Sequence, residues 1–291
     1  MNTEKKNLKF IFFGTPYAAS KTLQILKERG YIPEVIVTSP DAKKGRGLEM
    51  HETSVSTWAK ENNIKCLKPE KIDEEFINNI FPSHKSDLWP ILSVVVAYGK
   101  ILPEILIKKP EFGTINVHYS LLPKYRGASP LEACLLNGDE VTGVSIQQME
   151  YKLDSGQILR EEKIDIGIND TKEELRETLI SLGGNVLCDI LPQIVNQEIK
   201  SKAQDENLAT FCKKIKKEDG EINLEENAKE NWNKYRAYSG WPGVFFFATK
   251  HNKKIRCKIT KAKLENNQFI IEKIIPESKK EIDYESFLKQ N

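Results

Sequence analysis

Short apolar runs that alternate with helical segments are the feature that most restricts the fold of this chain. Leu8–Phe13 is a mostly apolar run that ends at Gly14-Thr15-Pro16, and Ala18–Arg29 follows it with leucines at helical spacing. Further apolar runs of strand length are Pro33–Thr38, Val94–Ala97 and Thr114–His118. Alternation of continuous apolar strands with helices is typical of a parallel sheet covered on both faces. The first half of the chain is therefore predicted to be a doubly wound, mostly parallel α/β domain.

The pattern of the chain changes after Thr210. Three strand candidates are separated there by turn-prone residues: Val244–Ala248, Ile255–Ile259 and Phe269–Ile275. Short strands with frequent turns suit a small antiparallel, OB-like β-barrel. We therefore expect two domains, at residues 1–200 and 208–291.

A helix and a linker are expected between these two regions. Thr171-Lys172-Glu173-Glu174 is a capping box, in which the threonine hydroxyl and the last carboxylate satisfy free amide groups at a helix start. The helix is expected to end near Gly183-Gly184. Asn196–Asn207 is polar, and we expect it to be the linker.

The charge balance excludes a chain that binds nucleic acid simply as a polycation. The 291 residues carry 44 basic and 42 acidic side chains, for a net charge of +2. From Asp205 onward, however, 18 basic residues face 14 acidic ones. In this part, apolar residues alternate with Lys254, Arg256 and Lys258, which predicts a strand with one apolar and one basic face.

The cysteines and the N-terminus predict a protein of a reducing compartment. The five cysteines are far apart and no pair has C-x-x-C spacing, which argues against a disulfide framework and a zinc ribbon. The first apolar run is too short for a secretory segment, and no run approaches the ~18 apolar residues of a membrane span. We expect a cytoplasmic protein with no membrane partner and no metal.

Three polar residues are candidates for chemistry. Asn116 and His118 stand two apart in Thr114–His118 and therefore project from the same face of a strand. In open α/β sheets, ligands bind at the carboxyl ends of strands. A satisfied structural hydrogen-bond pair is an equally good interpretation of these two residues alone. Asp154 lies in Asp154-Ser155-Gly156, which by itself is typical of a turn.

Taken together, these residues resemble the 10-formyltetrahydrofolate-dependent formyltransferases, and the likeness covers nearly the whole chain. The similar pieces are Phe12–Pro16, Ser39–Gly47, Val94–Pro103, Ile115–Pro130, Met149–Leu159, Lys214–Asn223 and Arg236–Gly243. The ordered set of Asn-x-His, Ser-Leu-Leu-Pro and Leu-Asp-x-Gly is specific, whereas each piece alone is weak. The resemblance implies a Rossmann-like formyltransferase domain followed by a tRNA-binding barrel.

The resemblance also implies a reaction. A formyl group passes from 10-formyltetrahydrofolate to the α-amine of methionyl-initiator-tRNA, which serves translation initiation. Asn116 would donate to the oxyanion of the tetrahedral intermediate. Asp154 would hold His118 in its doubly donating form and accept the proton of the amine, directly or through water.

Binding residues follow from the same resemblance. Folate would contact Ser120, Leu121, Leu122 and Pro123 on one side and Tyr98, Gly99, Ile101 and Leu102 on the other. The tRNA would contact Lys43, Lys44 and Arg46 in a basic loop, and Lys254, Arg256 and Lys258 on the basic strand. The leucines could instead be ordinary core residues, and the lysines could belong to an ordinary solvated surface. The protein is expected to be a monomer.

Several positions depart from the family pattern. Tyr119 stands where relatives carry a small residue, and Lys152 where a glycine is common. Leu48 and Glu49 interrupt the basic loop. These differences concern the shape of the pocket and the strength of tRNA binding.

Three alternative functions remain open. A formyltransferase of the same superfamily could use an amino group of a nucleotide-linked sugar or of glycinamide ribonucleotide, although the basic loop argues against this. A formate-releasing hydrolase is expected to carry a further N-terminal domain. The third alternative is a catalytically idle RNA-binding protein, against which the joint presence of Asn116, His118 and Asp154 speaks.

Overall fold

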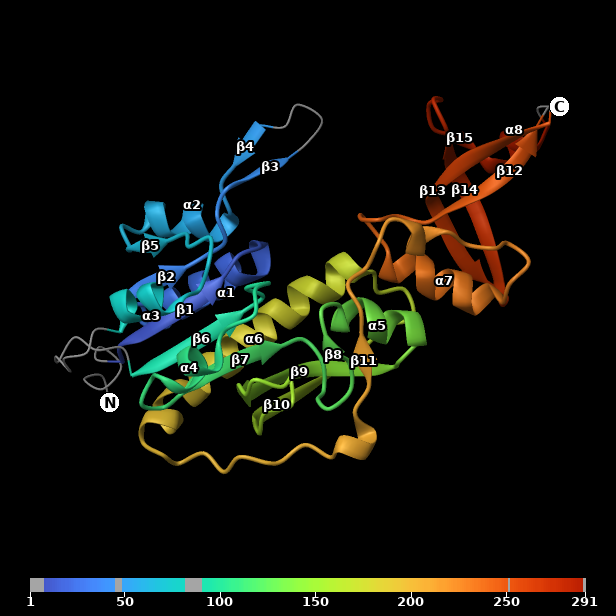
Figure 1. Ribbon diagram of the computed structural model, residues 1–291. Coiled ribbons are helices and arrows are strands. Elements are labelled where there is room, and N and C mark those ends of the chain that lie inside the picture. Colours follow the sequence, from blue (N-terminus) through green and yellow to red (C-terminus); the bar gives the residue numbers. More distant parts are fainter. Residues whose placement is uncertain (1–7, 45–48, 82–90, 251, 290–291) are drawn as a thin grey trace. The chain divides into compact units, whose positions relative to one another are not determined.

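A seven-stranded sheet forms the centre of the N-terminal half (Figure 1). This computed structural model describes residues 8–44, 49–81, 91–250 and 252–289. The sheet has the order β10-β9-β7-β6-β1-β2-β5. Its strands are β1 (Phe10–Gly14), β2 (Val35–Val37), β5 (Cys66–Leu67), β6 (Leu92–Val96), β7 (Thr114–His118), β9 (Val141–Gln148) and β10 (Ile158–Asp165). The strands β5, β2, β1, β6 and β7 pair in parallel, and β9 pairs antiparallel to β7.

Helices cover both faces of this sheet. One face carries α3 (Glu74–Ile80) and α4 (Glu104–Lys108), whose apolar side chains join Phe13 of β1 and Val95 of β6 in one buried cluster. The other face carries α1 (Tyr17–Glu28) and α6 (Lys172–Val195). A Cβ on Gly183 of α6 would lie 3.0 Å from a methyl group of Val117 in β7. The predicted doubly wound α/β architecture is confirmed.

The helix that begins at the capping box is longer than expected. Thr171 and Glu174 form the predicted reciprocal bonds: the Thr171 amide donates to the Glu174 carboxylate at 2.9 Å, and the Glu174 amide donates to the Thr171 hydroxyl at 3.5 Å. The predicted end near Gly183-Gly184 is wrong, because α6 continues to Val195. A Cβ on Gly184 would lie 2.7 Å from Ile25 of α1, so the glycines permit close packing of α6 against the sheet and α1. Tertiary packing therefore outweighs the low helix propensity of glycine.

Among the described helices, α6 alone is long and apolar enough to cross a membrane. Of its most apolar 18-residue window, 56% is buried inside the protein. Because Gly183 and Gly184 lie against β7 and α1, we interpret α6 as a core helix of the α/β unit.

The polar segment expected as a loop after β2 contains a hairpin. Its strands are β3 (Ala42–Lys44) and β4 (Glu49–His51), which pair antiparallel. The helix α2 (Ser54–Glu61) follows, and the Thr53 hydroxyl caps it by accepting from the Ser56 amide at 3.0 Å. The sequence-based expectation of a polar loop missed this hairpin, because strands of three residues are too short to show an apolar–polar alternation.

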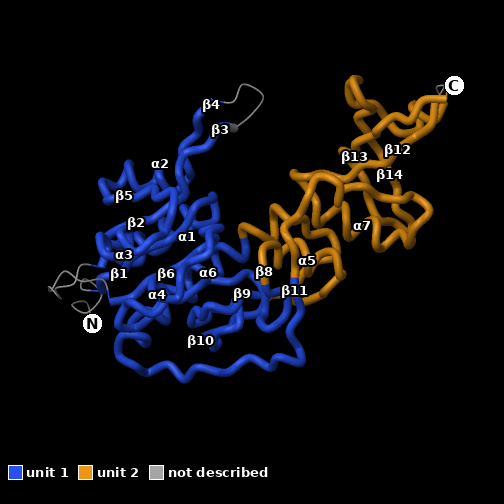
Figure 2. Tube along the Cα trace, in the orientation of Figure 1, with its two compact units in different colours: residues 1–126, 143–163, 178–211 blue, residues 127–142, 164–177, 212–291 orange. Residues whose placement is uncertain are grey.

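The chain forms two compact units (Figure 2). The first comprises residues 1–126, 143–163 and 178–211, and the second comprises residues 127–142, 164–177 and 212–291. The units therefore interleave in sequence, whereas we expected one boundary near residues 200–208. How the function divides between residues 1–200 and 208–291 stays a prediction.

A four-stranded antiparallel sheet forms the C-terminal part of the second unit. Its strands are β12 (Phe245–Lys250), β13 (Lys253–Glu265), β14 (Gln268–Pro276) and β15 (Ile282–Asp283). The same unit contains α5 (Pro130–Asn137), α7 (Ala228–Ala237) and α8 (Tyr284–Lys289). The described residues also form four short elements: β8 (Arg126–Gly127), β11 (Phe211–Cys212) and the 3₁₀ turns Glu206–Leu208 and Glu218–Gly220. The predicted C-terminal antiparallel β-structure is confirmed, with longer strands than the sequence indicated.

Replacing Phe13 tests the packing between the sheet and α3 and α4. Phe13 is fully buried, and its ring packs edge-on against Tyr98 at 5.6 Å between centroids. Phe13→Ala is expected to destabilise the α/β unit by about 3–5 kcal/mol, since it removes a large apolar group and leaves a cavity. Urea unfolding followed by circular dichroism measures the loss. The control is Ile32→Ala at a 53% exposed side chain, expected to change stability by about 0.5 kcal/mol or less. Equal effects would contradict the assigned core.

Candidate active site

The carboxyl ends of β1 and β6 meet where the chain changes direction across the sheet. From β1 the chain proceeds to β2 and β5 on one side, whereas β6 and β7 lie on the other. The Thr15 hydroxyl, just beyond β1, donates to the Tyr98 carbonyl at 2.9 Å. Ala97 and Gly99 flank Tyr98 with φ of +46° and +81°. In open α/β sheets this reversal of strand order is where ligands bind.

Strand β7 presents the candidate polar pair beside this point. Asn116 is half-buried and His118 is buried, and both project from the face that carries Val95. The antiparallel register places Asn116 opposite Gln147 and His118 opposite Ser145 of β9. These two cross-strand pairs place four polar side chains on one face of the sheet, and three of the four are buried.

The two ring nitrogens of His118 face two acceptor oxygens, one of them at hydrogen-bond distance. Its Nε2 lies 2.9 Å from the Tyr125 carbonyl, and its Nδ1 lies 3.8 Å from Oδ2 of Asp154. Because a carbonyl oxygen only accepts, Nε2 must carry the hydrogen in this bond. The contact with Asp154 is too long for a hydrogen bond, although it is close enough for an ionic interaction. The three candidate residues of the reaction are thus brought to one place.

The loop that contains Asp154 is fixed by partners distant in sequence. Asp154 has a φ of +46°, a conformation that costs a non-glycine residue energy. Gln147 donates to its Oδ1 at 2.9 Å. The amide group of Gln204 donates to the carbonyls of Asp154 and Gly156 at 2.8 and 2.7 Å. Both the side chain and the backbone of Asp154 are therefore oriented by glutamines.

Gln204 belongs to a segment, residues 200–208, that we call the strap. Lys202 and Ile158 exchange both backbone hydrogen bonds at 2.8 Å. The guanidinium of Arg126, which is fully buried, donates to Oε1 of Gln204 at 2.7 and 3.0 Å. The polar segment expected to be a linker is thus bonded along its length to the α/β unit.

Glu206 anchors the same strap through two cations. It accepts from Arg126 at 2.8 Å and from Lys152 at 2.6 Å. These hydrogen bonds lower the pKa of Glu206 to about 2, and the bond with Arg126 has the larger effect. Because the folded-state pKa is below the usual value of 4.5, the pairing stabilises the fold above that pH and is lost as the pH falls toward about 2. Lys152, one of the departures from the family pattern, is therefore a strap contact.

The residues expected to bind folate fall into two groups. Tyr98, Leu102, Ser120 and Leu122 are buried, whereas Ile101 is 84% exposed, Gly99 is exposed, and Leu121 and Pro123 are half-buried. Burial raises the pKa of Tyr98 to about 12. The amide of Leu122 donates to the Ser145 hydroxyl at 2.9 Å, and the Ser120 hydroxyl donates to the Lys124 carbonyl at 2.7 Å. Both bonds hold the loop that follows β7.

Tyr119 faces away from the candidate site. It follows directly after β7, and its ring lies toward α6, where a Cβ on Gly183 would be 3.4 Å away. Tyr119 is half-buried against this helix with its hydroxyl oxygen buried, and this burial raises the pKa of Tyr119 to about 12. This departure from the family pattern consequently does not narrow the space beside Asn116 and His118.

The basic residues expected to contact RNA lie at two places. Lys43 is exposed in β3 and Lys44 ends that strand, whereas Arg46 lies outside the described residues. On β13, Lys254, Arg256 and Lys258 share a face with Phe245 and Phe247 of β12. Lys254 lies 4.1 Å above the ring of Phe247, and Arg256 lies 3.7 Å above that of Phe245. These cation–π contacts order the basic side chains.

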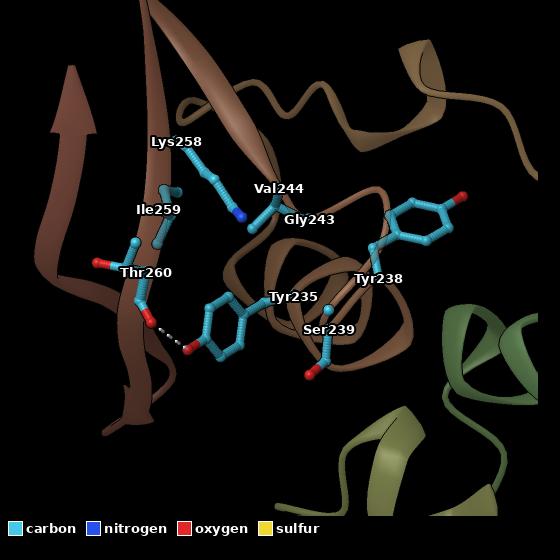
Figure 3. A pocket seen from close by; sticks show the side chains of 9 residues that line it. Tyr235, Tyr238, Ser239, Gly243, Val244, Lys258, Ile259 and Thr260 are labelled. Atoms are coloured by element: carbon cyan, nitrogen blue, oxygen red, sulfur yellow. Dashed lines mark hydrogen bonds between the residues drawn. The ribbon is translucent and has the colours of Figure 1, made fainter. Parts of the chain in front are cut away.

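A small open cavity lies behind Lys258 in the second unit (Figure 3). Its volume is about 180 Å³. The ammonium group of Lys258 points toward Val244 and Gly243, and the Tyr235 hydroxyl donates to the Thr260 carbonyl at 3.3 Å. The residues that line the cavity include Lys258 of β13, Tyr235 of α7, and Tyr238, which follows α7. In the described part of the chain, no group of three or more His, Cys, Asp or Glu side chains could hold a metal ion.

Sequence reasoning missed four residues of the site region. Ser145 and Gln147 could have been found, since polar residues at alternate positions of an apolar strand predict a polar face. Arg126 and Gln204 carry no local signal, because 78 residues separate them in the chain.

The formyl transferase family model matches residues 6–191, and the model of its C-terminal domain matches residues 214–270. The chain belongs to the formyl transferase family. The methionyl-tRNA formyltransferase of Sulfurihydrogenibium sp. is 39% identical over 240 residues, which cover 82% of this chain and 76% of the relative. The resemblance to formyltransferases that we inferred from the sequence is thus confirmed.

Solved structures share the fold. The methionyl-tRNA formyltransferase from Clostridium thermocellum is 16% identical, with a TM-score of 0.58 over 95% of this chain and 99% of that chain. An N-formyltransferase from Helicobacter canadensis, solved with folinic acid and dTDP-3-aminofucose, is 19% identical, with a TM-score of 0.63 over 91% and 95%. At these identities the likeness concerns the fold alone.

Gly156 offers a test of how tightly the Asp154 loop must be held. A Cβ on Gly156 would lie 1.6 Å from the backbone oxygen of Gln148, so Gly156→Ala must move the loop away from β9. We expect at least a tenfold lower kcat and about 1–3 kcal/mol less stability. The measurements are steady-state kinetics of formyl transfer and urea unfolding. The control is Ser155→Ala in the same loop, expected to keep both near normal. A fully active Gly156→Ala protein would contradict the role of this loop.

Proposed function

We propose that this protein transfers the formyl group of 10-formyltetrahydrofolate to the α-amine of methionyl-initiator-tRNA. The observation that carries the proposal is that Asn116, His118 and Asp154 lie together beside the point where the strand order of the sheet reverses. The names of the sequence relatives support the choice of acceptor: several methionyl-tRNA formyltransferases are 35–39% identical over 82–89% of this chain. The activity itself follows from membership of the family.

The proposed chemistry is an acyl transfer through a tetrahedral intermediate. The amine nitrogen attacks the formyl carbon, a new C–N bond forms, and the bond to N10 of the folate breaks. Negative charge develops on the former carbonyl oxygen, toward which the amide N–H groups of Asn116 would donate. Asp154 accepts the proton of the attacking amine, directly or through one water, and returns it to N10, which leaves as a neutral amine when the carbonyl re-forms.

His118 is proposed to act through position and charge. Its Nε2–H is engaged by the Tyr125 carbonyl at 2.9 Å, and its Nδ1 faces Asp154. This arrangement links the loop after β7, which holds the proposed folate contacts Ser120–Pro123, to the proposed base. The 3.8 Å separation would shorten when substrate excludes water, as is common for catalytic contacts that are long without ligand.

The tRNA is proposed to lie along the basic face of β13. None of the described ion pairs involves Lys254, Arg256 or Lys258, whereas Lys261 and Lys263 on the same strand pair with Glu272 and Glu265. Lys254 and Arg256 are ordered over aromatic rings, and cations outside the described ion pairs suit contacts with phosphates and exposed bases. A second contact is proposed at Lys43 and Lys44 of β3, together with Arg46, which lies outside the described residues.

We propose that the enzyme acts in the cytoplasm as a monomer, with no membrane partner. All five cysteines are free thiols, which suits a reducing compartment. The main alternative acceptor is the amine of a nucleotide-linked sugar. The similar fold of the Helicobacter canadensis enzyme keeps this alternative worth testing, although the basic face of β13 favours RNA.

The acceptor is tested by direct competition. With 10-formyltetrahydrofolate, the protein is expected to formylate methionyl-initiator-tRNA and to leave nucleotide-linked amino sugars and glycinamide ribonucleotide unmodified, as measured by radiolabelled formyl transfer. An inert tRNA beside a formylated sugar amine would overturn the proposed substrate.

The proposed oxyanion donor is tested by substitution. Asn116→Ala is expected to lower kcat by about 10²–10³, because an oxyanion donor is lost. The control is Asn252→Ala, at an exposed turn residue.

The basic face is tested by neutralising its three cations. The Lys254→Ala/Arg256→Ala/Lys258→Ala protein is expected to bind methionyl-tRNA at least tenfold more weakly and with a flatter dependence of log Kd on log salt. The matched control is Lys261→Ala/Lys263→Ala, which removes cations already paired with glutamates and should alter binding about twofold or less. Filter binding from 50 to 300 mM salt provides the slopes. Equal slopes for both proteins would make this face ordinary surface.

A further inference from the structure

Asp154 needs an orienting partner other than His118. The Nδ1 of His118 is 3.8 Å from Oδ2 of Asp154, which exceeds hydrogen-bond distance. The terminal torsion of an aspartate side chain has a broad range of allowed angles, so hydrogen bonds to the carboxylate decide its orientation. A base that must receive a proton in one direction loses efficiency when it samples several orientations. Whatever fixes the carboxylate of Asp154 therefore influences the reaction.

Gln147 supplies that fixation for the side chain. Its Nε2 lies 2.9 Å from Oδ1 of Asp154. The carboxylate can only accept, so the amide nitrogen of Gln147, not its oxygen, must face it. Gln147 is 1% exposed and stands opposite Asn116 in the sheet register, where β7 and β9 allow it little movement. With Oδ1 bound to Gln147, Oδ2 is directed toward His118.

Gln204 supplies the corresponding fixation for the backbone. Asp154 has its strained φ of +46°, and the carbonyls on either side of Ser155 both accept from Nε2 of Gln204. The other end of this amide accepts from the buried guanidinium of Arg126 at 2.7 and 3.0 Å. Since both its donor and its acceptor sites are used, Gln204 has one orientation. It holds the turn in the conformation from which Asp154 reaches Gln147.

We propose that Gln147 and Gln204 are positioning residues of formyl transfer, which act only through Asp154. Gln147 fixes the carboxylate, and Gln204, carried by the strap, fixes the backbone turn. The inference rests on the proposed role of Asp154 as base. It assigns the strap a part in the reaction, in addition to connecting the two halves of the chain.

The test is a set of double-mutant cycles. Gln147→Met and Gln204→Met remove the donor groups and keep a similar length. Each is expected to lower kcat about tenfold or more while the KM values for folate and tRNA stay within about twofold. In an Asp154→Asn background, the same substitutions should lower kcat by less than about twofold, because the group they orient no longer acts as a base. A merely structural role would cost the same factor in both backgrounds.

Gln148→Met is the matched control. Gln148 follows Gln147, points to the other face of β9, and donates to the carbonyls of Phe112 and Thr114 at 3.3 and 3.2 Å. It should affect kcat about twofold or less. If Gln147→Met does not fold by circular dichroism, Gln147→Glu keeps the length and replaces the donor by an acceptor, and it should lose at least as much kcat.

The outcomes separate the inference from the proposed function. Normal kcat in folded Gln147→Met and Gln204→Met proteins, or equal losses in both backgrounds, would overturn the inference alone. Normal kcat in Asp154→Asn would remove Asp154 as the base, and the inference would fall with it. Losses of kcat confined to the wild-type background would establish both residues as positioning residues.

Discussion

The antiparallel pairing of β7 with β9 is the interaction on which the site depends. The inner strands of the sheet are parallel, and β9 reverses direction beside β7. This register pairs Asn116 with Gln147 and His118 with Ser145, so polar side chains from two strands lie together on one face of the sheet. A shift by one residue would turn every one of the β9 side chains to the opposite face. It would also detach the Asp154 loop, which follows β9 directly, from both Gln147 and His118.

The sequence predicts the parts of the site that depend on local periodicity. Asn116 and His118 are recognised because polar residues two apart stand in an otherwise apolar strand. Alternation in β13 likewise predicts a basic face over a buried one, with Cys257 and Ile259 buried. Contacts across the chain are different. Arg126 and Gln204 meet only after the chain has folded, and neither the spacing nor the composition around Gln204 distinguishes it from a solvated linker residue.

Glycine and tyrosine in the core illustrate a second limit of local rules. A pair of glycines predicts the end of a helix, since glycine has low helix propensity. In α6 the same pair lies where Val117 and Ile25 approach the helix: a Cβ on Gly183 would lie 3.0 Å from Val117, and one on Gly184 would lie 2.7 Å from Ile25 and have to displace it. The need for close packing therefore decides the conformation. The bulky Tyr119 fits beside His118 because it packs toward this helix and away from the candidate site.

The buried guanidinium of Arg126 explains why a polar strap is ordered. A fully buried cation without partners is strongly unfavourable, because it loses its hydration. Gln204 and Glu206 compensate this loss, and Lys152 adds a second cation to the carboxylate of Glu206. If residues 200–208 moved away, the guanidinium would lose these partners and Asp154 would lose the donor that holds its left-handed turn. The same buried charge that keeps the strap in place therefore also keeps the proposed base oriented.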